Sequence, residues 1–470
     1  MATVQIKQCR AWHRQRTKLW QQQDIVVSSR SWCNICHTFL LPAGGSKLFC
    51  CCRYYLIAKI KNMEQVTVLL LILALLSMFT TLVVCGVCSA TCNCSMDVVP
   101  LLSESRELFI LDCTSEARDV SNASIADYFI YTQPDPFAVF DSNIFYGGFN
   151  NLKGLQIIGG IQGVAFIPPI ISLRLLDVSS ITLHYLASYS LASISSGLLS
   201  VSLTRNQMEF LSEDSLNGVN NLLFLNLSHN HIETPPVAVF SKLINLKTLD
   251  LSHNYLTSVS SELVSELRSL TWLSVSSNRI HNIDFISFPN SGIQFFATQN
   301  PIDNITWYAQ REAKLDTLDI SGNLIKVLSS VSFKGAIIEK LIMSDCKHLS
   351  AVYSGVIAES AIKSINMSSN PKLQFVDSTA FSNVLGLREV DLSNSGLSVV
   401  SQGWTNHSTI ERLFVRGNPL LCDCNLFWLE GSVTVDVDIL PLSDLCGAGS
   451  APVPRHCPPT IIYKSAHLTT

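Results

Sequence analysis

Charged residues are scarce in this 470-residue sequence: Asp, Glu, Lys and Arg make up 14% of it, whereas apolar residues make up 47%. A composition this apolar excludes disorder over most of the length. The few charges are also unevenly distributed. Residues 1–62 hold ten Lys or Arg and one Asp, a net charge of +9, which leaves −13 for the remainder because the whole chain carries −4. A remainder this acidic argues against nucleic acid as the main partner.

The sequence also lacks the residue groupings that enzymes use. No base or nucleophile is fixed beside its regularly spaced aspartates, and residues 44–47 lack the spacing of a phosphate-binding loop. His229 and His253 stand 24 residues apart at equivalent points of a repeated pattern, which indicates a consensus position and not a metal pair. We therefore predict that the protein is not an enzyme and holds no cofactor or metal.

What is present in abundance is one repeated pattern. Leu222, Leu225, Leu227 and Asn230 follow the spacing L-x-x-L-x-L-x-x-N, and residues 246–254 repeat it 24 positions later. The pattern is identified as the leucine-rich repeat. Each copy is expected to form a short strand with inward leucines, a turn whose buried Asn amide satisfies backbone groups, and a variable return segment. One copy cannot bury its apolar face alone, so the copies must stack.

Repeats at this period extend over residues 117–420 and number about 12 or 13. They predict an α/β fold: a right-handed leucine-rich-repeat solenoid, horseshoe-shaped, with a concave parallel β-sheet. Residues 108–112 are expected to form a preceding cap strand, and residues 128–132 one degenerate copy. The Asn position of the twelve clearest copies is occupied by Gly160, Ile181, Asn206, Asn230, Asn254, Asn278, Asn300, Asn323, Cys346, Asn370, Ser395 and Asn418.

Cysteines form an even cluster at each end of the repeats. Each cluster of four is read as two disulfide pairs, because an exported solenoid needs its terminal apolar faces covered. The predicted disulfide cysteines are Cys88, Cys92, Cys94 and Cys113 at the front and Cys422, Cys424, Cys446 and Cys457 at the back. Cys346, within the repeats, is expected to be a buried structural thiol, with an intermolecular disulfide as the alternative.

The surroundings of the two clusters are also informative. Residues 418–429 read N-P-L-L-C-D-C-N-L-F-W-L, which resembles the opening of the cysteine-rich C-terminal cap of extracellular leucine-rich-repeat proteins. The front cluster, C-x3-C-x-C followed by Cys113, resembles the matching N-terminal cap. The resemblance spans residues 88–457 and includes Slit-type modules, Toll-like receptor ectodomains and neuronal adhesion proteins. It implies disulfide-bonded caps at 87–116 and 421–457.

For the C-terminal cap, the resemblance also implies specific contacts. By that precedent Cys422 pairs with Cys446, Cys424 pairs with Cys457, and Trp428 lies against the last repeat.

A targeting segment precedes the repeats. Residues 65–96 contain no charge, and the basic residues 1–62 lie before them. Two interpretations stay open: a secretory signal peptide at 63–86 that starts at Met63, or an uncleaved anchor that spans the membrane through residues 66–87. Both place the repeats outside the cytoplasm, either secreted or on a single-pass membrane protein. Residues 1–62 are then a basic leader that is unstructured or not translated, and residues 458–470 are a tail too short and polar to anchor.

The concave face offers candidate binding residues. Leucines point inward on each strand, so the intervening positions face solvent. Phe224, Trp272 and Phe296 are expected there, flanked by Asp250 and Asp319. Exposed aromatics beside charges are typical of a protein-binding centre, although single exposed aromatics also occur merely as surface filling.

Asparagines in N-x-S/T sequons predict glycosylation in an exported protein. Asn226 and Asn366 fall on the concave face, and Asn93 is the least suited because it lies between two cysteines. The predicted glycosylation sites are Asn122, Asn226, Asn304, Asn366 and Asn406.

Together these features predict an extracellular recognition or adhesion scaffold that binds a protein ligand through its concave face. The alternative is a ligand-binding subunit, or a truncated relative, of a leucine-rich-repeat transmembrane receptor of innate immunity or development. The sequence leaves open a membrane tether through residues 66–87 and a homodimer.

Overall fold

The computed structural model describes residues 92–97, 108–114, 126–132, 151–159, 170–235, 237–283, 288, 291–307, 314–382, 384, 386–405, 409–421, 426, 428 and 436–437. The leader, the targeting segment, the tail and most of the two predicted caps lie outside these residues. In the part described, no helix is long and apolar enough to cross a bilayer.

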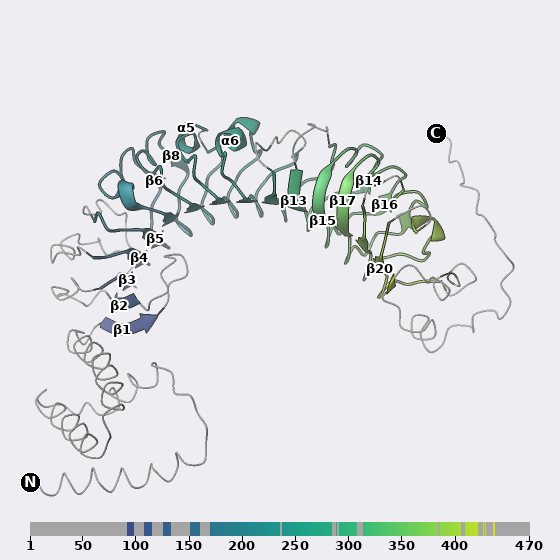
Figure 1. Ribbon diagram of the computed structural model, residues 1–470, viewed down its shortest axis with the longest axis horizontal. Helices are drawn as coiled ribbons and strands as arrows, with labels where there is room; N and C mark the ends of the chain where they lie inside the picture. The colour runs from purple at the N-terminus through teal and green to yellow at the C-terminus, as the bar shows by residue number, and fades with distance from the viewer. Residues whose placement is uncertain are drawn as a thin grey trace, which may run out of the picture.

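One large sheet runs through the whole described chain and follows the inner side of an arch (Figure 1). Its first two strands pair antiparallel, and all later neighbours pair parallel. Its sixteen strands, in spatial order, are β1 (Cys92–Asp97), β2 (Leu108–Thr114), β3 (Tyr128–Thr132), β4 (Gly154–Ile158), β5 (Leu175–Ser179), β7 (Ser200–Ser202), β9 (Phe224–Asn226), β10 (Thr248–Asp250), β11 (Trp272–Ser274), β12 (Ile293–Phe296), β13 (Lys314–Asp319), β15 (Ile337–Ile342), β17 (Ala361–Asn366), β19 (Glu389–Asp391), β20 (Arg412–Phe414) and β21 (Asp436–Val437).

The return segments form the outer side of the arch and hold little regular structure (Figure 1). Two short α-helices lie there, α5 (Val237–Phe240) and α6 (Ser261–Glu266), with two 3-10 turns, η4 (Ser195–Gly197) and η5 (Gln402–Trp404). Two small sheets complete the returns: β6 (Tyr185–Leu186) with β8 (Phe210–Leu211), and β14 (Val327–Leu328), β16 (Ala351–Val352) and β18 (Phe375–Val376). The fold is therefore the α/β leucine-rich-repeat solenoid that the sequence predicts, with a parallel sheet and few helices.

The core is a continuous column between the sheet and the returns. Inward residues of neighbouring strands stand side by side, as Leu225, Leu249 and Leu273 do, and each is at most 1% exposed. Large side chains from the returns fill the other half, among them Phe240, Phe333 and Trp404. Each repeat buries its apolar face against the next one, because a single repeat of about 24 residues cannot bury that face by itself.

Buried asparagines connect the repeats on the inside of the turns. The side-chain Nδ2 of Asn278 donates to the carbonyl oxygens of Leu251 (2.9 Å) and Val275 (2.8 Å), and its Oδ1 accepts from the backbone N–H of Leu256 (3.0 Å). Each amide therefore binds its own turn and the preceding repeat. Equivalent bonds recur at Asn206, Asn230, Asn254, Asn300, Asn323 and Asn370, which we call the asparagine ladder.

The ladder has one sulfur-bearing position. Cys346 is fully buried and free, and its thiol points to the carbonyl oxygen of Ile320 at 3.7 Å. Burial raises the pKa of the Cys346 thiol to about 11, so the group is neutral at physiological pH. These observations fit the buried structural thiol that the sequence indicates.

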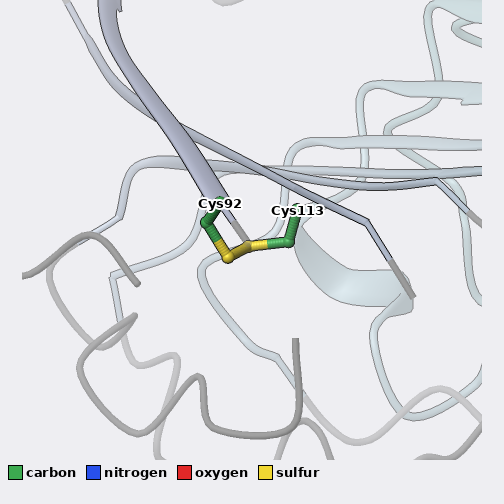
Figure 2. Close-up of a disulfide and its surroundings, with 2 residues drawn as sticks. All are labelled: Cys92 and Cys113. Atoms are coloured by element: carbon green, nitrogen blue, oxygen red, sulfur yellow. A yellow bond between two sulfur atoms is a disulfide. The ribbon is translucent and has the colours of Figure 1, made fainter. Parts of the chain in front are cut away.

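At the N-terminal end, β1 covers the edge of β2, and a disulfide joins Cys92 to Cys113 across this antiparallel pair (Figure 2). Cys88 and the four C-terminal cysteines lie outside the described residues, as does the side chain of Cys94. At the other end, Trp428 packs on the core and donates from Nε1 to the carbonyl oxygen of Val400 at 3.3 Å. The contact places Trp428 against the last repeats.

The asparagine ladder generates a stability prediction. Asn278→Ala leaves several buried carbonyl and N–H groups unpaired, so we expect the free energy of unfolding to fall by about 3 kcal/mol. Urea denaturation followed by circular dichroism measures the change. Gln294→Ala, which removes an exposed amide on β12, serves as the control and should change stability by less than about 0.5 kcal/mol. Equal effects of the two substitutions would show that the ladder amide is dispensable.

Candidate functional site

The concave face is organised in two regular columns of side chains. The first contains Phe224, Thr248, Trp272, Gln294, Thr317 and Lys340. Two residues further along each strand, the second contains Asn226, Asp250, Ser274, Phe296, Asp319 and Ile342. Because every residue of a column is the pairing partner of the next, neighbours lie about 4.8 Å apart on the sheet.

Only two of the three predicted aromatics form a cluster. Trp272 on β11 and Phe296 on β12 lie with ring centroids 5.4 Å apart and an interplanar angle of 39°. Phe224 is on β9, two strands away from β11, with Thr248 between. All three side chains are half-buried. Trp272 and Phe296 are therefore in ring contact, and Phe224 lies two strands away from Trp272.

The two predicted acidic residues have a structural role in the turns. One carboxylate oxygen of Asp250 accepts from the backbone N–H of Ser252 at 2.9 Å, and Asp319 binds Ser321 in the same way at 3.0 Å. Asp391 repeats the arrangement with Ser393. A side-chain oxygen that binds the backbone two residues later fixes the turn at the end of a strand. This turn bond uses one oxygen of each carboxylate.

The same turn explains two of the predicted glycosylation sites. Asn226 and Asn366 occupy the Asp position, and each Oδ1 accepts from the N–H of the serine two residues later, Ser228 and Ser368. The sequon therefore coincides with the repeat's own pattern at these positions. Asn304 is exposed on a return segment, as glycosylation needs, while Asn122 and Asn406 lie outside the described residues.

A partly buried polar group lies toward the N-terminal end of the sheet. Gln156 Nε2 donates to Asp177 Oδ2 at 2.8 Å, and burial raises the pKa of the Asp177 carboxyl. Burial, followed by the nearby Asp177 charge, raises the pKa of Tyr128 to about 12. These shifts have the direction expected of polar groups packed on a sheet, and hydrogen bonds from Gln156, Ser202 and Ser179 to Asp177 act against the effect of burial.

Charges dominate the opposite end of the sheet, but they pair with one another. The Nη2 atom of Arg412 lies 2.5 Å from Oε2 of Glu389 on the adjacent strand, and Lys363 forms an ion pair with Glu339. The hydrogen bond from Lys363 is the main cause that lowers the pKa of Glu339. Exposed pairs of this kind add little stability and leave few unpaired charges for a ligand.

Sequence reasoning missed two pairs of aromatics at the two small sheets, of which Tyr353 directly follows β16. Tyr185 and Phe210 are each 51% exposed and stack with centroids 5.4 Å apart, and Tyr353 and Phe375 lie 5.9 Å apart. The sequence did contain a signal for these aromatics, because they recur four to seven residues after the Asn position of their repeats. The returns are variable in length, however, so the sequence did not show that these positions align.

Metal chemistry finds no support in the described part of the chain. No three His, Cys, Asp or Glu side chains gather there in an arrangement that could hold a metal ion. His229 and His253 instead stack on each other with ring centroids 4.0 Å apart.

Comparisons with known proteins agree with the repeats. Two models of the leucine-rich repeat match, one at residues 221–243 and the other at 235–280. The chain is similar to mouse leucine-rich repeat-containing protein 52, with 35% identity over 57 residues. That match covers 12% of this chain and 18% of the mouse protein, so it concerns a short segment of each and not the whole protein.

Solved structures share the fold at low identity. The mouse RP105/MD-1 complex contains a similar chain with a TM-score of 0.53 and 19% identity, covering 70% of this chain and 56% of that one. The LRIM1/APL1C complex gives a TM-score of 0.50 and 17% identity, covering 73% and 67%. Residues 221–280 are thus leucine-rich repeats within a leucine-rich-repeat solenoid.

The turn role of the concave acids is open to test. Asp250→Ala removes the bond to the Ser252 N–H, so we expect the free energy of unfolding to fall by about 1 kcal/mol. Glu233→Ala, at an exposed carboxylate that makes no hydrogen bond to another described residue, is the control and should be nearly neutral. Thermal melts of both variants measure the difference, and an unchanged Asp250→Ala melt would contradict the assignment.

Proposed function

We propose that this protein is an extracellular recognition scaffold that binds a protein ligand through its concave face. The observation that carries the proposal is the Trp272–Phe296 pair, two half-buried aromatic rings in contact at the middle of a fixed sheet. Binding energy in protein interfaces concentrates on aromatic anchors near the centre of the contact. The carboxylates of Asp250 and Asp319 on either side provide polar contacts around that centre.

Preorganisation favours this use of the sheet. The strands are short, but parallel pairing on both sides and the asparagine ladder behind them fix their backbone. A surface that is already ordered loses little conformational entropy on binding, so a few anchors suffice for affinity.

An extracytoplasmic location is supported by two independent features. The uncharged residues 65–96 are suited to export, and Cys92 and Cys113 form a disulfide, which persists in oxidising compartments. Cleavage after the apolar segment would release the scaffold, whereas an intact segment at residues 66–87 would tether it.

The related structures are consistent with a protein ligand. Both the RP105/MD-1 and the LRIM1/APL1C structures are complexes between proteins, built on the same solenoid. Nothing in the described residues supplies a catalytic grouping, which favours binding as the activity of this face.

The aromatic pair provides the decisive test. Trp272→Ala combined with Phe296→Ala should weaken binding to the native partner at least about 100-fold, because both rings are central anchors. Surface plasmon resonance against the partner identified by cross-linking on intact cells measures the loss. The matched control is Tyr353→Ala with Phe375→Ala, which removes two contacting aromatics at a small outer sheet, one in β18 and one directly after β16, and should leave affinity unchanged. Full affinity of the Trp272 and Phe296 variant, with a normal melt, would disprove the concave site.

A further inference from the structure

A second surface lies on the turns that follow β7, β9, β10 and β11, at the rim of the sheet. The residue just before each ladder asparagine is Arg205, His229 or His253 in three successive repeats. The residue just after it is His231, Tyr255 or Arg279, one repeat later in each case. We call these six residues the rim ladder.

Side chains of the rim ladder stack from one repeat to the next. The imidazoles of His229 and His253 are parallel within 8°, with centroids 4.0 Å apart. Beside them, the rings of His231 and Tyr255 are parallel within 1° at 5.2 Å, and the Arg279 guanidinium carbon lies 4.0 Å above the Tyr255 ring. Two short stacks of cationic and titratable groups therefore run side by side along the rim.

The backbone holds the first stack in place. Arg205, His229 and His253 have positive φ angles of 55°, 56° and 53°, and their N–H groups donate to carbonyl oxygens of the following repeat. Glycine or asparagine fits such a conformation more easily than arginine or histidine. Gly322, Asn394 and Gly417 occupy the same position in later repeats. The turn itself therefore does not require the Arg and His side chains.

The positive groups of the rim ladder are available to a ligand. Arg205, His229, His253 and Arg279 are exposed, and no carboxylate of the described residues lies within ion-pair distance of either arginine. The ring of Tyr255 covers one face of the Arg279 guanidinium, which leaves its N–H edge to bind a carboxylate.

Neighbouring charges make this surface sensitive to pH. Arg205 and His253 flank His229 on adjacent turns, and Asp250 approaches from β10; burial and then the two cations lower the pKa of His229. A bound anion offsets the repulsion between two stacked imidazolium rings, so protonation and anion binding favour each other. Arg205 keeps its positive charge beside His229 at every pH near neutrality, and Asp250 is the one carboxylate among the groups that act on His229 in the described residues.

We propose that the rim ladder binds a carboxylate-rich segment of a protein partner, and binds it more tightly at acidic than at neutral pH. A nucleic acid is disfavoured because residues beyond 62 carry a net charge of −13. Separate carboxylates can each meet an imidazolium or guanidinium edge without a continuous positive field. The rim ladder shares no residue with the Trp272–Phe296 pair.

A direct binding experiment uses the full chain and a defined probe. The probe is a fluorescent twelve-residue peptide of alternating Glu and Ser, followed by anisotropy in about 50 mM salt at pH 5.5 and pH 7.5. Glutamate, with an ordinary pKa of about 4.3, stays ionised at both values, whereas histidine, at about 6.5, does not stay neutral. We expect the dissociation constant to be at least about tenfold lower at pH 5.5.

Variants separate the rim from the rest of the surface. His229→Asn with His253→Asn suits the turn backbone and should abolish the pH dependence while the thermal melt is retained. Arg279→Gln should weaken binding at both pH values. His348→Asn, at an exposed histidine outside the rim ladder, should behave as the unmodified chain does, and so should Trp272→Ala with Phe296→Ala.

Several outcomes would overturn the proposal. These are absence of peptide binding at pH 5.5, a tenfold pH effect that persists in the His229 and His253 double variant, and loss of peptide binding on removal of Trp272 and Phe296. Displacement of the peptide by twelve-nucleotide oligothymidylate at lower concentration than by unlabelled peptide would identify nucleic acid as the better ligand and would also contradict it.

Discussion

The buried asparagine amide is the interaction on which the solenoid depends. Every turn at the end of a strand removes backbone N–H and C=O groups from water and offers no strand partner for them. The Asn278 side chain binds Leu251 and Val275 on one side and the Leu256 N–H on the other, so one residue satisfies groups of two repeats. Without it the leucines could still be buried, but only with unpaired polar groups beside them, which is the more costly arrangement.

Surface properties follow from that internal regularity. Because each turn is fixed in the same way, outward side chains form straight columns, on the concave face and again along the rim. The face presents Trp272 against Phe296, and the rim presents His229 against His253. The concave face therefore carries aromatic rings with acidic neighbours, whereas the rim carries arginine and histidine. A partner that contacts both surfaces would meet aromatic and acidic groups on the concave face and arginine and histidine side chains on the rim of a single rigid body.

Periodicity made the register predictable from sequence, since one spacing fixes which residues point inward and which stand next to each other. Trp272 beside Phe296 follows from that spacing, but half-burial of both does not, because it depends on diagonal neighbours. The spacing placed Asp250 correctly on the surface, yet its bond to Ser252 depends on turn geometry. Likewise, His229 and His253 recur at the same repeat position in the sequence. Stacking of their rings also depends on the positive φ angles of their turns, and histidine is not a residue type that predicts a positive φ.

Hydrogen exchange tests the central claim most directly. The amides of Ile232, Leu256 and Ile280 lie beyond the strands and donate only to the ladder asparagines Asn254, Asn278 and Asn300. If these bonds hold the repeats together, the three amides should exchange as slowly as the strand amides of Leu249 and Leu273, at least about a thousandfold slower than an unstructured chain. Exchange at the rate of open turns, with the strands still protected, would contradict the account.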